Sequence, residues 1–312
     1  MRVVFMGTPE FAVPSLRALL DGHDVRLVIS RPDRPAGRGM SLRRSAVAAV
    51  GGAAGVDVYL PDNPRAPEVL ERVRQAQPEV LVVAAYGRIL PSELLEVAPH
   101  GGLNVHASLL PRWRGASPVA AAILAGDTES GVSIMRMEAG LDTGPVLLQR
   151  RTSINVDETA GELTARLAEL GADALSEGLV RLAHGDAVFT PQSADAVIVA
   201  RPVRKEDGDL DWTRDADYIE RAVRAFDPWP GVRLPVGGEP VRVLRARALP
   251  TWAAGAGGAP AGTVLEADHQ GIVVMAGDRP VRLEAVQAPG KRAMPAADYA
   301  RGRPDLRELG RG

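Results

Sequence analysis

The sequence contains no cysteine, and this absence excludes several kinds of chemistry at once. Without thiols the chain can form no disulfide, no thiolate nucleophile and no cysteine-ligated metal site. Its five histidines are scattered and do not show the spacing of a helical zinc motif. Histidines and carboxylates alone could still hold a metal, but no motif points to one, so we expect a protein without metal.

Long apolar runs are also missing. No stretch of about eighteen apolar residues occurs, and the chain does not open on a basic segment followed by an apolar one. The composition, 46% hydrophobic and 24% charged, is typical of globular proteins. A length of 312 residues suggests two domains or one large one. We expect a soluble, cytoplasmic monomer without membrane attachment.

Lysine is scarce, because Lys205 and Lys291 are the only lysines among 37 basic residues. Genomic base composition explains this bias. The net charge of −2 is unevenly distributed: residues 1–50 carry +4, residues 51–200 carry −8 and residues 201–312 carry +2. Two basic ends around an acidic middle could bind a polyanion, although ordinary variation in surface charge explains the pattern equally well.

The glycine-rich motifs of nucleotide-binding proteins are absent as well. A strand predicted over residues 2–7 leads into GTPEF, which has one glycine and matches neither GxGxxG nor GxxxxGK[ST]. Neither a dinucleotide fingerprint nor a P-loop is therefore indicated. Open parallel sheets still bind ligands at the carboxyl ends of their strands. Three loops fall there, at residues 7–11, 84–91 and 104–115.

Predicted strands and helices alternate over residues 1–185, which is typical of an α/β fold with a mostly parallel sheet. The strands are predicted over residues 2–7, 23–30, 56–61, 78–86, 101–107, 131–137 and 144–154. The helices are predicted over residues 8–22, 66–77, 117–127 and 159–185. Thr8 is expected to cap the first helix and Gly22 to end it.

A second domain is predicted after a change in sequence texture. Residues 186–203 show little periodicity and are predicted to be a linker. Beyond them we expect one short helix over residues 216–226. We then expect four short strands between Gly and Pro turns, over residues 240–249, 261–268, 271–277 and 280–287. This pattern predicts a small β-barrel domain over residues 204–312. The expected catalytic domain covers residues 1–185.

Two polar side chains interrupt the strand predicted over residues 101–107. Asn104 and His106 are two residues apart, so both point to one face of the strand, near its carboxyl end. Burying an amide and an imidazole costs stability unless both find partners. A satisfied structural pair explains the pattern, but the position favours a functional site. Asn can donate to a developing oxyanion, and His can donate to it or transfer a proton.

A third polar residue, Asp142, completes a set that suits acyl transfer. It lies between glycines in the segment 140–147, where a simple turn is the common explanation. Near His106, its carboxylate would favour the imidazolium and could relay a proton. Asn, His and Asp without Ser or Cys favour direct acyl transfer to an amine over a covalent acyl-enzyme. The apolar loop at 108–115 suits a flat ring, or it is a plain connection.

Longer segments resemble a known family. NVHASLLPRWRGASP at 104–118, followed by GLDTGPVL at 140–147, resembles the folate-dependent formyltransferases. Further segments resemble, within this family, the members that act on methionyl initiator tRNA. The resemblance covers the chain from the first predicted strand to about residue 295. Five further segments carry this narrower resemblance: MGTPEFAVPSL at 6–16, RPDRPAGRG at 31–39, VVAAYGRILP at 82–91, RAFDPWPG at 224–231 and QAPGKRAM at 287–294.

The resemblance implies a Rossmann-like catalytic domain followed by a C-terminal barrel of the oligonucleotide-binding type. It implies 10-formyltetrahydrofolate as formyl donor and the α-amino group of methionyl initiator tRNA as acceptor, a step of translation initiation. The positions that match the family's catalytic residues are Asn104, His106 and Asp142. The positions that match its tetrahydrofolate-binding loop are Ser108, Leu109, Leu110 and Pro111.

The basic residues expected to contact tRNA depart in part from the family. Arg38 matches an arginine that reaches the acceptor stem. Lysines often follow the GRG segment in the family, whereas Met40 and Ser41 stand there in this chain. Arg43 and Arg44 come slightly later and could take over phosphate contacts, because arginine forks onto phosphate. The residues that we expect to contact tRNA are Arg38, Arg43, Arg44 and Lys205.

Two alternatives stay open. A folate-dependent formyltransferase or hydrolase acting on a small-molecule amine or on water would show the same Asn104, His106 and Asp142. The arginine-rich loop and the basic second domain argue against that alternative. A non-catalytic RNA-binding protein is the alternative from another class, and the intact set of three residues argues against it.

Overall fold

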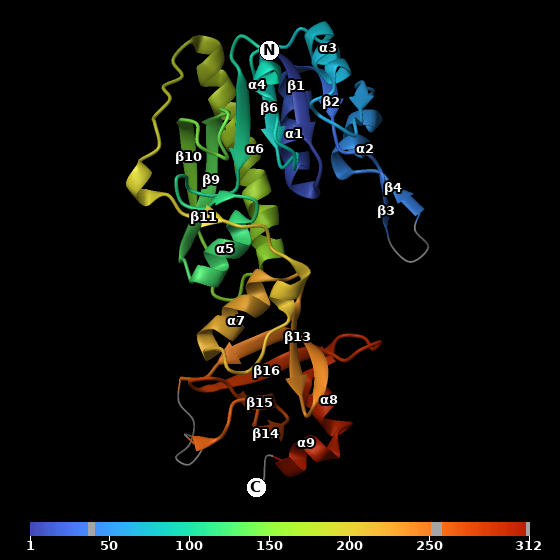
Figure 1. Cartoon of the computed structure of the whole chain (residues 1–312), viewed down its shortest axis with the longest axis vertical. Coiled ribbons are helices and arrows are strands. Elements are labelled where there is room, and N and C mark those ends of the chain that lie inside the picture. The colour runs from blue at the N-terminus through green and yellow to red at the C-terminus, as the bar shows by residue number, and fades with distance from the viewer. Residues whose placement is uncertain (37–40, 251–257, 310–312) are drawn as a thin grey trace. The chain divides into compact units, whose positions relative to one another are not determined.

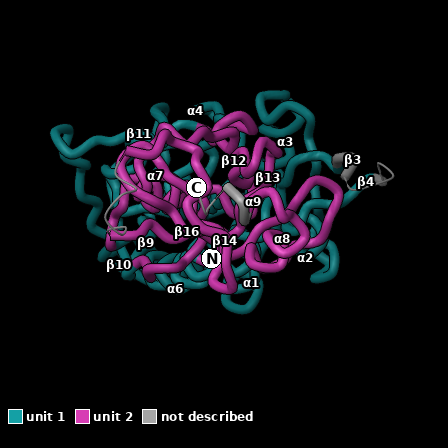
Figure 2. Tube along the Cα trace, turned by 90° about the horizontal axis from the view of Figure 1, so that it is seen from below, with its two compact units in different colours: residues 1–118, 129–153, 163–201 teal, residues 119–128, 154–162, 202–312 magenta. Residues whose placement is uncertain are grey.

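A computed structural model describes residues 1–36, 41–250 and 258–309 (Figure 1). The chain divides into two compact units, coloured teal and magenta in Figure 2. Unit 1 comprises residues 1–118, 129–153 and 163–201, and unit 2 comprises residues 119–128, 154–162 and 202–312. Two short segments, residues 119–128 and 154–162, thus pack with the C-terminal part of the chain. The domain limits expected at residues 185 and 203 stay a prediction.

Unit 1 is built around a mixed seven-stranded sheet (Figure 1). In pairing order its strands are β10 (Val146–Ser153), β9 (Glu129–Arg136), β7 (Gly102–His106), β6 (Val80–Ala84), β1 (Arg2–Gly7), β2 (Asp24–Ile29) and β5 (Val58–Tyr59). The strands from β7 to β5 run parallel, whereas β9 and β10 run antiparallel to their neighbours. The expected α/β fold with a mostly parallel sheet is confirmed.

The central strands are buried along almost their whole length. All five residues of β6 and all five of β7 are buried, which is typical of parallel strands covered on both faces. The helices associated with this sheet are α1 (Val13–Gly22), α2 (Ala46–Ala53), α3 (Pro67–Gln75), α4 (Ser92–Leu95) and α6 (Ala160–His184). Helix α6 approaches β7 at Gly171, where a Cβ atom would lie 2.8 Å from Cγ1 of Val105.

The first helix begins later than the sequence predicts. A 3-10 turn, η1 (Glu10–Ala12), follows β1, and α1 begins at Val13. The expected N-cap at Thr8 is therefore wrong: its hydroxyl donates to the carbonyl of Tyr86 at 3.2 Å instead. Pro14 lies in the first helical turn, where a missing N–H costs nothing. The expected end of the helix at Gly22 is confirmed.

Unit 2 contains an antiparallel sheet, which confirms the expected second, β-rich domain. The sheet order is β12-β13-β16-β15-β14, with β17 paired to β16. These strands are β12 (Val232–Val236), β13 (Glu239–Ala248), β14 (Val264–Asp268), β15 (Gly271–Met275), β16 (Pro280–Gln287) and β17 (Met294–Pro295). Its helices are α5 (Pro118–Ala125), η3 (Lys205–Gly208), α7 (Ala216–Ala225), α8 (Ala296–Arg301) and α9 (Pro304–Leu309).

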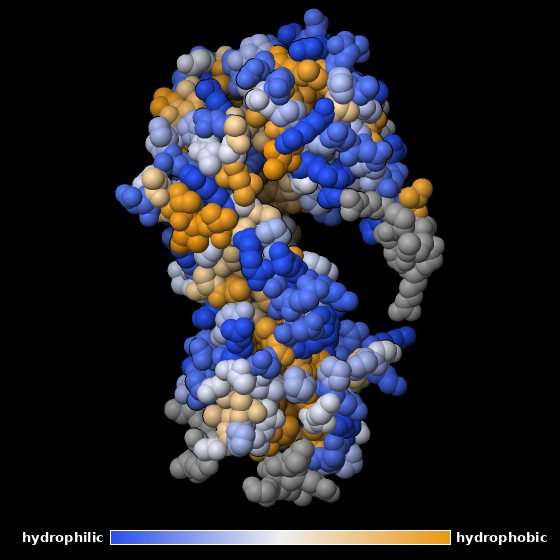
Figure 3. All heavy atoms as spheres, viewed as in Figure 1, coloured by the Kyte–Doolittle hydropathy of each residue, from blue (hydrophilic) through white to orange (hydrophobic). Residues whose placement is uncertain are grey.

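Short elements complete unit 1. Strands β3 (Arg34–Ala36) and β4 (Ser41–Arg43) form an antiparallel pair, and β8 (Arg114–Gly115) pairs in parallel with β11 (Val199–Ala200), which follows the 3-10 turn η2 (Ala194–Ala196). Hydrophilic side chains cover most of the visible face of each unit (Figure 3). Within the described ranges, no helix combines the length and the apolar character needed to cross a membrane.

Candidate active site

Strand β7 carries two polar side chains to the carboxyl end of the parallel part of the sheet. Asn104 and His106 are 9% and 6% exposed, respectively, so both are buried. Their strand lies between β6 and β9, in the middle of the sheet. Both side chains therefore need partners inside the protein, because an unpaired buried polar group is costly.

Asp142 supplies partners for both side chains. It lies in the loop between β9 and β10, and its carboxylate reaches back to β7. The Nδ2 atom of Asn104 donates to Oδ1 of Asp142 at 3.4 Å. The Nδ1 atom of His106 lies 3.7 Å from Oδ2 of the same carboxylate. The structure thus brings together the three residues that the sequence singles out, across 38 positions of the chain.

The second nitrogen of the imidazole is held by the backbone. The Nε2 atom of His106 lies 2.9 Å from the carbonyl oxygen of Trp113. Because a carbonyl can only accept, Nε2 must carry a proton. In the neutral ring, Nδ1 is then the nitrogen with the free lone pair, and a second proton would convert it into a donor directed at Asp142. The two ring nitrogens of His106 thus have different partners, and Nδ1 is the one that faces the carboxylate of Asp142.

The amide of Gly115 provides a contact that the sequence did not indicate. Its N–H donates to Oδ2 of Asp142 at 2.8 Å, so the carboxylate is bound from β7 and from β8. Gly144, two residues after the aspartate, is required by a close approach of the backbone. A Cβ atom there would lie 1.9 Å from the carbonyl oxygen of Arg136. This approach explains the glycine of the Asp-Thr-Gly segment.

Side chains of β9 and β10 hold the backbone of the loop over residues 108–111. Ser133 donates through its hydroxyl to the carbonyl of Ser108 at 2.6 Å and accepts from the amide of Leu110 at 3.1 Å. Gln149 donates to the carbonyl of Leu110 at 2.9 Å. The Ser108 side chain is 1% exposed and donates to the carbonyl of Arg112 at 2.7 Å. The loop shape is thus fixed by internal bonds, and its assignment to folate stays a prediction.

The residues expected to contact tRNA are distributed over both units. Arg38 lies outside the described residues. Arg43, which ends β4, and the neighbouring Arg44 are exposed in unit 1. Lys205 begins η3 in unit 2, is exposed, and has acidic neighbours at Glu206, Asp207 and Asp209. These assignments stay predictions.

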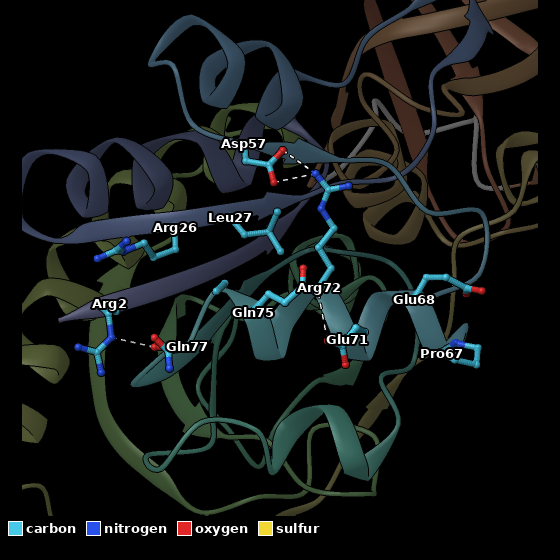
Figure 4. Close-up of a pocket in the computed structure, with 11 residues that line it drawn as sticks. Arg2, Arg26, Leu27, Asp57, Pro67, Glu68, Glu71, Arg72, Gln75 and Gln77 are labelled. Atoms are coloured by element: carbon cyan, nitrogen blue, oxygen red, sulfur yellow. Dashed lines mark hydrogen bonds and ion pairs between the residues drawn. The ribbon is translucent and has the colours of Figure 1, made fainter.

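A hollow of about 720 Å³ lies away from Asn104, His106 and Asp142, along α3 and beside β2 in unit 1 (Figure 4). Its arginines are already paired. Arg72 binds both carboxylate oxygens of Asp57, at 2.8 and 2.7 Å, and Arg2 donates to the carbonyl of Gln77. We assign no ligand to it. Among the residues that the structure describes, no group of three or more His, Asp or Glu side chains could hold a metal ion.

Solved structures with the same fold include two that contain folates. An N-formyltransferase from Helicobacter canadensis, in complex with folinic acid and dTDP-3-aminofucose, superimposes with a TM-score of 0.68 over 92% of this chain and 98% of its own, at 16% identity. HypX from Aquifex aeolicus in complex with tetrahydrofolic acid gives a TM-score of 0.62 over 96% of this chain and 46% of its own, at 18% identity. At these identities the likeness shows the fold alone.

Sequence comparison is more specific. Residues 1–179 match the family described as formyl transferase, and residues 202–304 match the formyl transferase C-terminal domain. The methionyl-tRNA formyltransferase of Xanthomonas euvesicatoria pv. vesicatoria is 49% identical over 99% of this chain and 100% of its own length. That of Stenotrophomonas maltophilia K279a is 48% identical over 98% and 99%. The chain therefore belongs to the methionyl-tRNA formyltransferase family.

Proposed function

We propose that this protein transfers the formyl group of 10-formyltetrahydrofolate to the α-amino group of methionyl initiator tRNA, in the cytoplasm. The single observation that supports the chemistry most directly is the meeting of Asn104, His106 and Asp142 at the carboxyl end of β7. In open α/β sheets this is where ligands bind. The acceptor is supported by relatives that carry this activity in their name and match almost the whole chain.

The first step forms the bond between nitrogen and the formyl carbon. The methionyl amine, in its neutral form, attacks the formyl carbon, and the carbonyl oxygen becomes an oxyanion. Asn104 donates to this oxyanion through Nδ2. Protonated His106, whose Nδ1 faces Asp142 and whose Nε2 donates to the carbonyl of Trp113, stabilises the oxyanion by its positive charge. One donor of this kind is worth roughly 10²–10³ in rate.

The second step breaks the bond between the formyl carbon and N10 of the folate. The proton released by the attacking amine passes through the carboxylate of Asp142 and reaches N10 as the folate leaves. The products are formylmethionyl-tRNA and tetrahydrofolate, with no net change in protons. Acid–base help of this kind contributes roughly 10²–10⁴ in rate.

The expected binding surfaces complete the proposal. Residues 108–111, Ser108 to Pro111, would line the folate site. Arg38, Arg43, Arg44 and Lys205 would contact tRNA phosphates, because guanidinium and ammonium groups bind phosphate regardless of sequence.

A comparison of acceptors tests this function. Purified protein would be given 10-formyltetrahydrofolate, and tetrahydrofolate release would be followed with methionyl initiator tRNA, with an amino-sugar nucleotide, and with no acceptor. We expect release only with the tRNA. Release with the sugar nucleotide, or in water alone, would replace the proposed function by one of the two alternatives that share the same three residues.

A further inference from the structure

We propose that Gln192 is a positioning residue for the reaction, because it holds the backbone of the loop that carries Asp142. This inference rests on the function proposed above, since Gln192 would act only through the carboxylate of Asp142. Gln192 lies beyond α6, in the segment 186–201, which is part of the linker that the sequence predicts over residues 186–203.

The loop that carries Asp142 has little of its own to fix its shape. Residues 138–143 are exposed to solvent, except for Asp142, which is half-buried. Asp142 adopts a left-handed backbone conformation, with φ of 52°, which is disfavoured for a residue with a side chain. Such a conformation persists where the surrounding structure holds it.

The register of a short antiparallel contact brings Gln192 to this loop. Val146 and Thr190 exchange two backbone hydrogen bonds, each of 2.8 Å. In an antiparallel pair, two steps back along one strand lie opposite two steps forward along the other. Gln192 therefore lies opposite Gly144. Figure 1 shows the yellow segment after α6 passing along the edge of the sheet beside β10 before it reaches β11.

The amide of Gln192 binds the loop at two points. Its Nε2 donates to the carbonyl of Asp142 at 2.9 Å and to the carbonyl of Gly144 at 2.7 Å. Its Oε1 accepts from Nε of Arg114 at 2.9 Å, which orients the amide. Arg114 precedes Gly115, whose N–H binds the Asp142 carboxylate. The side chain of Gln192 thus links the backbone of the Asp142 loop to the side chain of Arg114.

Few other contacts hold the segment 186–201 in this place. Residues 190–199 are exposed except for the half-buried Gln192 and Val197. The ring of Phe189 lies under the guanidinium of Arg136, 4.0 Å from it, and β11 pairs with β8. Between these two anchors, the side chain of Gln192 reaches the Asp142 loop. Its loss should leave the fold intact and release the loop.

Two substitutions of Gln192 distinguish the role of its donor, Nε2, from that of its acceptor, Oε1. Gln192→Leu removes both, and Gln192→Glu keeps the acceptor for Arg114 but turns a second oxygen toward two carbonyls. We expect each change to lower kcat about 10²-fold, with the KM for tRNA little changed, because misplacement by about 1 Å can cost that factor. The matched control is Ser193→Ala, at the next, exposed position, which should keep wild-type kcat.

A double-mutant cycle decides whether Gln192 acts through Asp142. Single-turnover rates would be measured for Asp142→Ala with and without Gln192→Leu, and with Gln192→Glu should the leucine variant not fold. We expect the Gln192 change to have no further effect once Asp142 is gone. An equal loss in both backgrounds, or a wild-type kcat for the Gln192 variants, would overturn the inference. A wild-type kcat for Asp142→Ala alone would instead overturn the proposed catalytic role on which it rests.

Discussion

At the scale of single residues, the site depends on one carboxylate that is bound by an amide side chain, an imidazole and a backbone N–H. Asn104, His106 and Gly115 all face Asp142. Because Nε2 of His106 donates to the carbonyl of Trp113, the nitrogen that faces Asp142 is Nδ1. The arrangement leaves each side chain one defined task, and each task can be removed separately.

We expect Asn104→Ala and His106→Ala each to lower kcat by at least about 10²-fold, since each removes one group that stabilises the oxyanion. Folate binding should be largely kept, because neither side chain belongs to the loop 108–111. Steady-state kinetics and titration of the folate by fluorescence would measure the two quantities. Near-normal kcat in both variants would refute this assignment.

The sequence located the three side chains but not the groups that hold them. Asn104 and His106 are visible because they interrupt an apolar strand, and Asp142 because it lies between glycines. The carbonyl of Trp113 and the N–H of Gly115 cannot be predicted as partners from a sequence, since nearly every residue has these backbone groups. Gln192 could not be predicted for another reason. A glutamine in a polar segment is common, and only the pairing of Thr190 with Val146 shows that it lies beside the Asp142 loop.

At the scale of secondary-structure elements, helix α6 packs closely on β7 at one point. Gly171 meets Val105, which lies between Asn104 and His106 on that strand, and a Cβ atom at residue 171 would lie 2.8 Å from Cγ1 of Val105. Apolar residues at helical spacing predicted the helix over residues 159–185, and a short apolar run predicted the strand over residues 101–107. Helix α2, at the other end of the sheet beside β2 and β5, is one of the elements that the sequence analysis did not predict. Its glycines weaken the helical pattern, although Ser45 accepts from the amide of Ala48 as an N-cap.

We expect Gly171→Ala to destabilise the protein by about 1 kcal/mol. Overpacking costs about 1–3 kcal/mol, and the better helix propensity of alanine returns up to about 1 kcal/mol. Thermal or urea unfolding would measure the change, with Gly22→Ala as the control, since a Cβ there meets nothing within 4 Å. Equal stability of the two variants would contradict the close packing of α6 on β7.

At the scale of the whole molecule, the proposed function requires the chain to bind a folate and a large polyanion. The net charge of −2 does not favour a polyanion, so binding has to depend on local arginines. Composition and alternation predicted two domains of the correct classes. They did not predict that residues 119–128 and 154–162 pack with unit 2, because such exchanges depend on tertiary contacts far apart in the sequence.

We expect Arg38→Ala to weaken the use of tRNA without affecting folate binding, because a guanidinium that contacts phosphate has no role in the folate site. The KM for methionyl initiator tRNA and the Kd for folate would be compared between this variant and the wild type. A short methionyl amine offered as acceptor is the control. If the variant is equally impaired with that short acceptor, the loop serves the chemistry and not the RNA.

The most direct measurement follows a labelled formyl group. Labelled 10-formyltetrahydrofolate would be offered with methionyl initiator tRNA and with methionyl elongator tRNA, side by side. The account predicts labelling of the initiator alone. Consumption of the folate with no label on either tRNA would contradict it, and would assign the three residues at the end of β7 to hydrolysis or to a small amine.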